Sequence, residues 1–103
     1  MAGSGFVAVL VIDLHFPDAE SLKGKRKELK SVKAQLHGRL GAAVSETRHQ
    51  DLWQRSTLTA ALTSGSLATL SAAADGVERW LDARFPQGVS VERLVASVED
   101  LRG

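Results

Sequence analysis

Two short pairs of Asp and His are the only combination in this sequence that suggests acid–base catalysis or metal binding. Asp13 and His15 stand two residues apart, and His49 and Asp51 repeat that spacing further along the chain. Neither pair has the H-x-x-x-H or H-E-x-x-H spacing that places two imidazoles on one face of a helix. We therefore expect structural roles, with Asp13 and His15 satisfying backbone groups of a loop and Asp51 shaping a turn.

Other classes of reactive site are also excluded or disfavoured. The chain has no cysteine, which excludes disulfides, thiolate metal sites and thiol redox chemistry. Gly3 and Gly5 precede the first apolar run instead of following it, so they do not form a glycine-rich phosphate loop, and no serine has a G-x-S-x-G context. A hydrolase of phosphorylated substrates is a weaker third option, because residues 16–20 contain no basic group. We expect no enzymatic activity, no cofactor and no metal.

Composition and length indicate one folded domain. Of the 103 residues, 44% are hydrophobic and 24% are charged, as in ordinary globular proteins. A chain of this length supports its own core, so we expect a single domain over residues 1–103. The longest apolar run, Phe6–Ile12, is far shorter than the roughly 20 residues needed to span a bilayer. No basic residue precedes this run as in an export signal, so we expect a cytoplasmic protein.

Hydrophobic periodicity divides the chain into four strands and two helices. The run from Phe6 is apolar on both alternating faces, which is typical of a strand in the middle of a sheet. Ser21 is a suitable N-cap for the first helix, and Gly41 suits the left-handed position that closes it. The expected elements are strands over residues 6–15, 42–48, 52–63 and 89–98, and helices over residues 21–40 and 67–85. This order predicts an α+β, ferredoxin-like β-α-β-β-α-β fold, an antiparallel four-stranded sheet with two helices on one face.

The sheet face away from the helices is predicted to be apolar. RNA-recognition motifs share this element order and stack bases on aromatic residues of their central strands. Here the first strand offers only Val7, Val9 and Val11 to that face, so base stacking on the sheet is disfavoured. An apolar face of this kind is instead suited to contact with another copy of the chain. We assign these valines and Trp53, with core or interface as its favoured places, to a candidate interface.

The charges of the chain cancel overall but not locally. The formal net charge is +1. Residues 21–55 carry nine basic and three acidic side chains, a net charge of +6, whereas the rest carries four basic and nine acidic ones, a net charge of −5. Such asymmetry between segments indicates an anionic partner, although the overall charge does not.

A helical wheel collects much of this positive charge on one side of the first helix. This basic flank consists of Lys23, Arg26, Lys27, Lys30 and Lys33. His37 falls on the same side, and Lys25 and Arg39 fall on the opposite edge. Like charges three or four residues apart repel, and a helix shaped only for solubility would interleave glutamates there. Two interpretations stay open: a surface that contacts phosphates and binds more weakly in salt, or an ordinary solvated helix face.

Three stretches of the chain resemble one known family. The first strand ends V-I-D-L-H-F-P, the helix opens S-L-K-G-K-R-K-E-L-K-S-V-K, and the hairpin contains Q-D-L-W-Q-R-S-T-L. They are similar to the L-H-x-P turn, the S-L-K-E-K-R block and the Q-D-L-W-Q-R-A-T-L stretch of the YlxP-like bacterial family, a family of unknown function. The last stretch is long and unusual, so the match is specific, and the resemblance covers Phe6 to Leu62.

The resemblance implies a ferredoxin-like domain and a role close to translation. Genes of the family often neighbour those for translation initiation and ribosome maturation factors, which points to the small ribosomal subunit or its RNA. The matching polar positions are His15, Ser21, Lys23, Lys25, Arg26, Gln50, Asp51, Gln54 and Arg55. No catalytic role is established for them in the family. Gly24 replaces an acidic residue, and Gly38–Gly41 replaces an Asn-containing helix end, which alters its cap.

Two hypotheses of different classes follow. The first is a non-enzymatic cytoplasmic domain that binds structured RNA or a ribosome-associated surface through the basic flank, with Arg55 and Gln54 joining it from the hairpin. Contacts of this kind position a nucleic acid without reading its sequence. The alternative is a homo-oligomeric, or homodimeric, protein-interaction module whose interface is formed by Val7, Val9, Val11 and Trp53.

Overall fold

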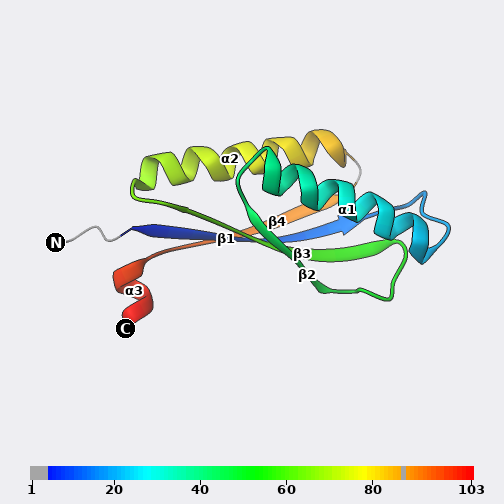
Figure 1. Cartoon of the computed structure of the whole chain (residues 1–103), viewed down its shortest axis with the longest axis horizontal. Helices are drawn as coiled ribbons and strands as arrows, with labels where there is room; N and C mark the ends of the chain where they lie inside the picture. The colour runs from blue at the N-terminus through cyan, green and yellow to red at the C-terminus, as the bar shows by residue number, and fades with distance from the viewer. Residues whose placement is uncertain (1–4, 87) are drawn as a thin grey trace.

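Four strands and three helices make up the part of the chain that the structure describes, residues 5–86 and 88–103 of a computed structural model (Figure 1). In chain order they are β1 (Phe6–His15), α1 (Leu22–Gly38), β2 (Ala43–Arg48), β3 (Arg55–Ser64), α2 (Leu67–Arg84), β4 (Val89–Ser97) and α3 (Val98–Arg102). None of the helices in these ranges is both long and apolar enough to cross a membrane.

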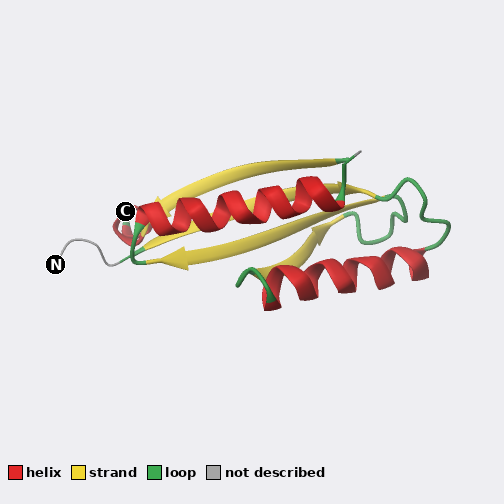
Figure 2. Ribbon diagram, turned by 90° about the horizontal axis from the view of Figure 1, so that it is seen from above, coloured by secondary structure: helices red, strands yellow, loops and turns green. Residues whose placement is uncertain are grey.

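β1 occupies the interior of the sheet, as its two apolar faces predict. The strand order is β2-β3-β1-β4, and every neighbouring pair is antiparallel. Val9 pairs with Ala61 of β3 on one side and with Leu94 of β4 on the other. Both long helices lie above the sheet in Figure 1, and Figure 2 shows them side by side, with α1 toward the β2 edge. The ferredoxin-like fold class is therefore confirmed.

The core fills the layer between the sheet and the two long helices. Alternate residues of β1, from Ala8 to Leu14, point into this layer and are completely buried. The helices meet them with apolar residues at helical spacing: Leu29, Val32 and Leu36 from α1, and Leu70, Ala74, Val77 and Leu81 from α2. Burying each Leu or Val contributes roughly 1.5–3 kcal/mol. This packing fixes which face of the sheet is covered and leaves the other face open.

The ends of α1 follow the signals in the sequence. The Ser21 hydroxyl accepts a hydrogen bond from the Gly24 N–H at 3.0 Å, which satisfies a free donor of the first turn. At the other end, Gly41 has a φ of +73°, and its N–H donates to the His37 carbonyl at 3.2 Å. The expected roles of Ser21 and Gly41 are thus confirmed, although the helix itself ends at Gly38.

A charged cluster joins β4 to α2. The Arg93 guanidinium donates to the Asp75 carboxylate at 2.8 Å and donates from two nitrogens to Glu78. These hydrogen bonds, first to Asp75 and then to Glu78, raise the pKa of Arg93 above its ordinary value. The helix-facing side of β4 is therefore tied to α2 by ion pairs as well as by apolar contacts.

The last residues of the chain form a helix that the expected elements do not include. Ser97 and Asp100 form a reciprocal capping box, in which each side chain accepts from the other residue's backbone N–H. Bonding from the Ser97 backbone N–H and then the Ser97 side chain lowers the pKa of Asp100 below its ordinary value. The box starts the five-residue helix α3. The S-x-x-D spacing is a cap signal that could have indicated this turn from the sequence.

Candidate nucleic-acid interface

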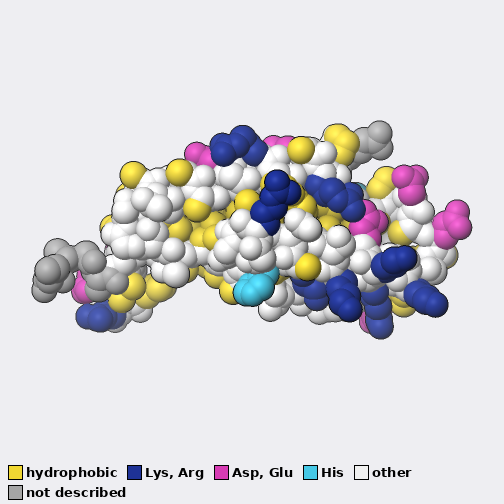
Figure 3. Space-filling view, turned by 45° about the horizontal axis from the view of Figure 1, so that its top comes forward, with side chains coloured by type: hydrophobic (Ala, Val, Ile, Leu, Met, Phe, Trp, Pro, Cys, Tyr) yellow, Lys and Arg dark blue, Asp and Glu magenta, His cyan; other side chains and the backbone are white. Residues whose placement is uncertain are grey.

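The basic flank forms an exposed surface along α1. Lys23, Arg26, Lys27 and Lys30 are exposed, and Lys33 is half-buried. Within the described residues none of these five has a carboxylate in ion-pair distance, and the one acid of α1, Glu28, pairs with Arg84 of α2 at 3.0 Å. Figure 3 shows Lys and Arg side chains gathered over the end of the molecule where α1 begins.

Several acidic residues outside α1 are engaged with other cations. Glu46 faces Lys25, Asp75 and Glu78 hold Arg93, and Asp13 lies 3.9 Å from Arg55. These four acids therefore do not pair with the basic flank. The flank is a strip of positive charge on one helix with no carboxylate in ion-pair distance among the described residues.

Lys25 departs from its expected place on an outer edge of the helix. Its side chain is completely buried, and its ammonium donates to the carbonyls of His49, at 2.6 Å, and Leu52. The Glu46 carboxylate lies 3.4 Å from the same nitrogen and also accepts a hydrogen bond from Ser56. The sequence contains a signal for this burial, because at 100° per residue Lys25 falls inside the apolar stripe of Leu29, Val32 and Leu36. A lysine there must find acceptors, and the hairpin supplies them.

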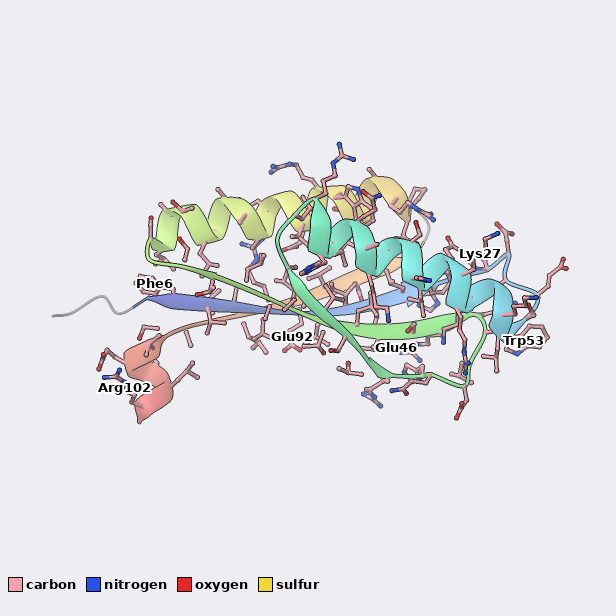
Figure 4. All side chains as sticks on the ribbon, viewed as in Figure 1. Phe6, Lys27, Glu46, Trp53, Glu92 and Arg102 are labelled. Atoms are coloured by element: carbon pink, nitrogen blue, oxygen red, sulfur yellow. The ribbon has the colours of Figure 1, made fainter. Side chains whose placement is uncertain are left out.

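The anchoring by Lys25 shapes the tip of the β2–β3 hairpin, residues 49–54. His49 adopts a left-handed φ of +63°, and β3 begins only at Arg55. The prediction of a strand from Leu52 was therefore wrong, because carbonyls at the tip bond to Lys25 instead of to a neighbouring strand. Leu52 and Trp53 are consequently left 47% and 50% exposed. In Figure 4 Trp53 lies beside the first turn of α1.

Arg55 does not join the flank on α1. It pairs across the strands with His15, and its guanidinium lies near Asp13. Residues 13 and 15 alternate with the buried residues of β1, so Arg55 belongs to the face of the sheet that the helices leave open. The structure thus brings five of the six predicted nucleic-acid contacts together and places the sixth on another face.

The candidate interface residues also separate into two groups. Val7, Val9 and Val11 are half-buried on the open face of β1. Figure 4 places Trp53 and Arg102 at opposite ends of the molecule, with α3 at the end away from Trp53. An apolar hollow of about 200 Å³ lies at the α3 end, lined by Val7, Val9, Leu94, Val95, Ala96 and Leu101. Leu94 and Leu101, which the sequence did not single out, are 51% and 67% exposed.

The Asp and His pairs form no metal-binding group among the described residues. Asp13 accepts a hydrogen bond from the Thr57 hydroxyl at 2.6 Å, while the His49 carbonyl accepts from Lys25. His15 lines a cavity of about 290 Å³, and the ion-paired Glu28 and Arg84 also line it. The Asp13 carboxylate thus bonds a side chain of β3 instead of the expected backbone groups of a loop, and His49 takes part through its backbone carbonyl.

A family model described as "Protein of unknown function (DUF503)" matches residues 7–94, from β1 into β4. The chain is also 32% identical over 82 residues to the "Uncharacterized protein YlxP" of Bacillus subtilis (strain 168). That alignment covers 80% of this chain and 85% of the relative. The resemblance carried by the three sequence stretches is therefore confirmed.

Two solved structures align with the chain at low identity. The de novo designed protein Foldit4 aligns with a TM-score of 0.58 at 11% identity, covering 90% of this chain and 97% of the design. The 30S ribosomal protein S6 of Thermotoga maritima aligns with a TM-score of 0.47 at 9% identity, covering 94% and 92% of the two chains. The likeness to the design concerns the fold alone, and a shared fold does not fix a function.

Proposed function

The chain belongs to DUF503, a family of proteins of unknown function, and we propose that it is a non-enzymatic cytoplasmic domain that binds structured RNA or a ribosome-associated surface. The basic flank of α1 is the contact surface. The observation that carries the proposal is that its five cations have no carboxylate partner among the described residues, although acids elsewhere on the chain do pair with cations.

The spacing of the flank suits a phosphate backbone. A helix rises about 1.5 Å per residue, so Lys23 to Lys33 extend over about 15 Å. Side chains three and four residues apart lie on one side of the helix, and five cations in a row can therefore follow successive phosphates. Each neutralised phosphate releases counterions, which favours binding and makes it sensitive to salt. Because these contacts are to phosphates, they would bind RNA by shape and charge rather than by sequence.

Reversing three charges of the flank tests this proposal. The variant Lys23→Glu, Lys27→Glu, Lys30→Glu is expected to bind ribosomal RNA fragments at least tenfold more weakly, with a smaller dependence of affinity on salt concentration. The measurement is a titration by fluorescence anisotropy over a salt series.

A triple reversal away from the flank provides the matched control. Arg39, Arg79 and Arg102 are exposed and lie outside the flank, and their reversal changes the net charge by the same amount. We expect the control to lose much less affinity than the flank variant. Equal losses in both variants, or unchanged affinity after reversal of the flank, would contradict binding through α1.

A second candidate function is self-association through the apolar hollow, with another copy of this chain as the occupant. Its six lining residues carry no charge, and exposed apolar surface of this kind marks interaction sites. A two-fold interface places the same patch on both sides, which an uncharged surface permits without repulsion. Since α1 covers the other face of the sheet, the two basic flanks would remain on the outside of such a dimer.

Sedimentation velocity at micromolar concentrations tests the dimer. We expect the native chain to sediment as a dimer and Leu94→Glu to sediment as a monomer, because the carboxylate would be buried without a partner. Leu52→Glu is the control, since Leu52 is similarly exposed but belongs to the hairpin tip. A native chain that stays monomeric near 100 μM, about the range of weak association, would rule this candidate out.

A further inference from the structure

We propose that Trp53 is a stacking platform for an unpaired base, so that the RNA bound by this protein carries a loop or bulge nucleotide next to the phosphates held by α1. This inference rests on the proposed function and adds the kind of RNA to it. Its starting point is the contrast between the two tryptophans of the chain. Trp80 packs against the core, whereas Trp53 is half exposed and stands outside the core cluster.

The backbone is fixed on both sides of Trp53. The carbonyl of Leu52 accepts from the buried ammonium of Lys25, and the carbonyl of Gln54 accepts from the Phe16 N–H at 2.9 Å. Leu52 also donates its own N–H to the His49 carbonyl at 3.2 Å. The indole is therefore presented from an ordered segment although its ring is half in solvent. An aromatic ring held in this way loses little conformational freedom when a ligand stacks on it.

Trp53 lies at the end of α1 where the basic flank begins. Lys25 lies between Lys23 and Arg26 in the chain, and its bonds hold the hairpin tip against this part of α1. Figure 4 shows Trp53 beside the start of the helix that also carries Lys27. Proteins that bind unpaired nucleotides combine a positively charged track for the backbone with aromatic rings for the bases. Both parts of this combination are present here, and the bonds of Lys25 connect the hairpin tip to α1.

The open sheet face does not offer an equivalent platform. The central positions of β1 and β3 on that face are Val9, Val11, Thr59 and Ala61, none of which is aromatic. Bases stack on π-faces, so the site for a base lies at the hairpin tip instead of on the sheet. A regular duplex keeps its bases stacked on one another, and it would therefore engage only the cations of α1.

Comparing two RNA probes tests the inference. One probe is a hairpin with an unpaired loop, and the other is a fully paired duplex of the same stem length. Trp53→Ala is expected to weaken hairpin binding at least fivefold and to leave duplex binding within twofold, since base–aromatic stacking is sequence-tolerant but needs a free base. Trp53→Phe should retain most of the affinity. Leu52→Ala, which truncates a neighbour of similar exposure without removing a ring, should leave both affinities unchanged.

Fluorescence gives a second readout. In the variant Trp80→Phe only Trp53 emits, and stacking of a base on its ring should quench this emission with the hairpin but not with the duplex. The inference is overturned if Trp53→Ala weakens binding of both probes equally or of neither. In that case, loss of binding after charge reversal on α1 would still support the proposed function. No binding of either probe to the native chain overturns both. Loss of dimer formation in Trp53→Ala, with RNA binding intact, would assign the ring to a protein contact instead.

Discussion

Replacing Lys25 with alanine is expected to lower the free energy of unfolding by about 3–5 kcal/mol, the range seen when one partner of a buried ion pair is removed. The ammonium is completely buried and serves the carbonyls of His49 and Leu52 and the carboxylate of Glu46. Without it, the acceptors at the base of the hairpin tip lose their donor and the lysine stem leaves a void. Since domains of this kind are stable by about 5–15 kcal/mol, this loss is a large fraction of the total.

Urea unfolding followed by circular dichroism measures the effect, and two further variants separate its causes. Lys25→Met restores apolar volume but not the charge, so it should recover only the part due to the void. Lys23→Ala changes an exposed lysine two residues away and should shift stability by no more than about 0.5 kcal/mol. If Lys25→Ala were as stable as Lys23→Ala, the ammonium would not be holding the hairpin tip.

Replacing Gly88 with alanine is expected to cost about 2–3 kcal/mol, the upper part of the range for overpacking. A Cβ atom at this position would lie 2.7 Å from the Cβ of His15, closer than nonbonded carbons approach. The two segments cannot easily separate, because the His15 N–H donates to the Gly88 carbonyl at 2.9 Å. Moving the two segments apart to relieve the contact between the two Cβ atoms would therefore break the hydrogen bond between the His15 N–H and the Gly88 carbonyl.

A double-mutant cycle in thermal unfolding identifies the contact. His15→Ala keeps its own Cβ and should not rescue Gly88→Ala, whereas His15→Gly should rescue most of the loss. Gly38→Ala serves as the control, since no neighbouring atom lies within 4 Å of the added carbon and alanine is a better helix former than glycine. Destabilisation of both glycine variants by the same amount would mean that the contact with His15 is not the cause.

The parts of the fold that could be predicted are those in which local pattern and tertiary packing agree. β1 is apolar on both faces and lies inside the sheet, and the Ser21 cap begins α1. The start of β3 was misplaced because Leu52 and Trp53 resemble strand residues locally, while a distant lysine takes the carbonyl of Leu52. The helix α3 was missed because a single capping box of four residues is a short signal.

Only the part of the candidate site that lies on α1 could be predicted from the sequence. A wheel places the residues of the basic flank on one side of α1 whatever the rest of the chain does. Lys25 has the same residue type but an inward position, and its acceptors lie 24 and 27 residues away in the sequence. The place of Arg55 depends on strand register, which decides the face of every residue in β3. The inward position of Lys25 follows from the wheel, whereas its acceptors and the face that Arg55 occupies depend on contacts between segments far apart in the sequence.

The burial of one lysine also affects how the protein will react with amine-directed reagents. All five lysines of the chain are on α1, and Lys25 alone among them is completely enclosed. Lysine modification therefore reports on a single helix, without background from side chains elsewhere. Four of these amines lie on the basic flank, and the fifth is expected to react only when the hairpin tip opens. A single labelling reaction can thus separate occupancy of the surface from local unfolding beneath it.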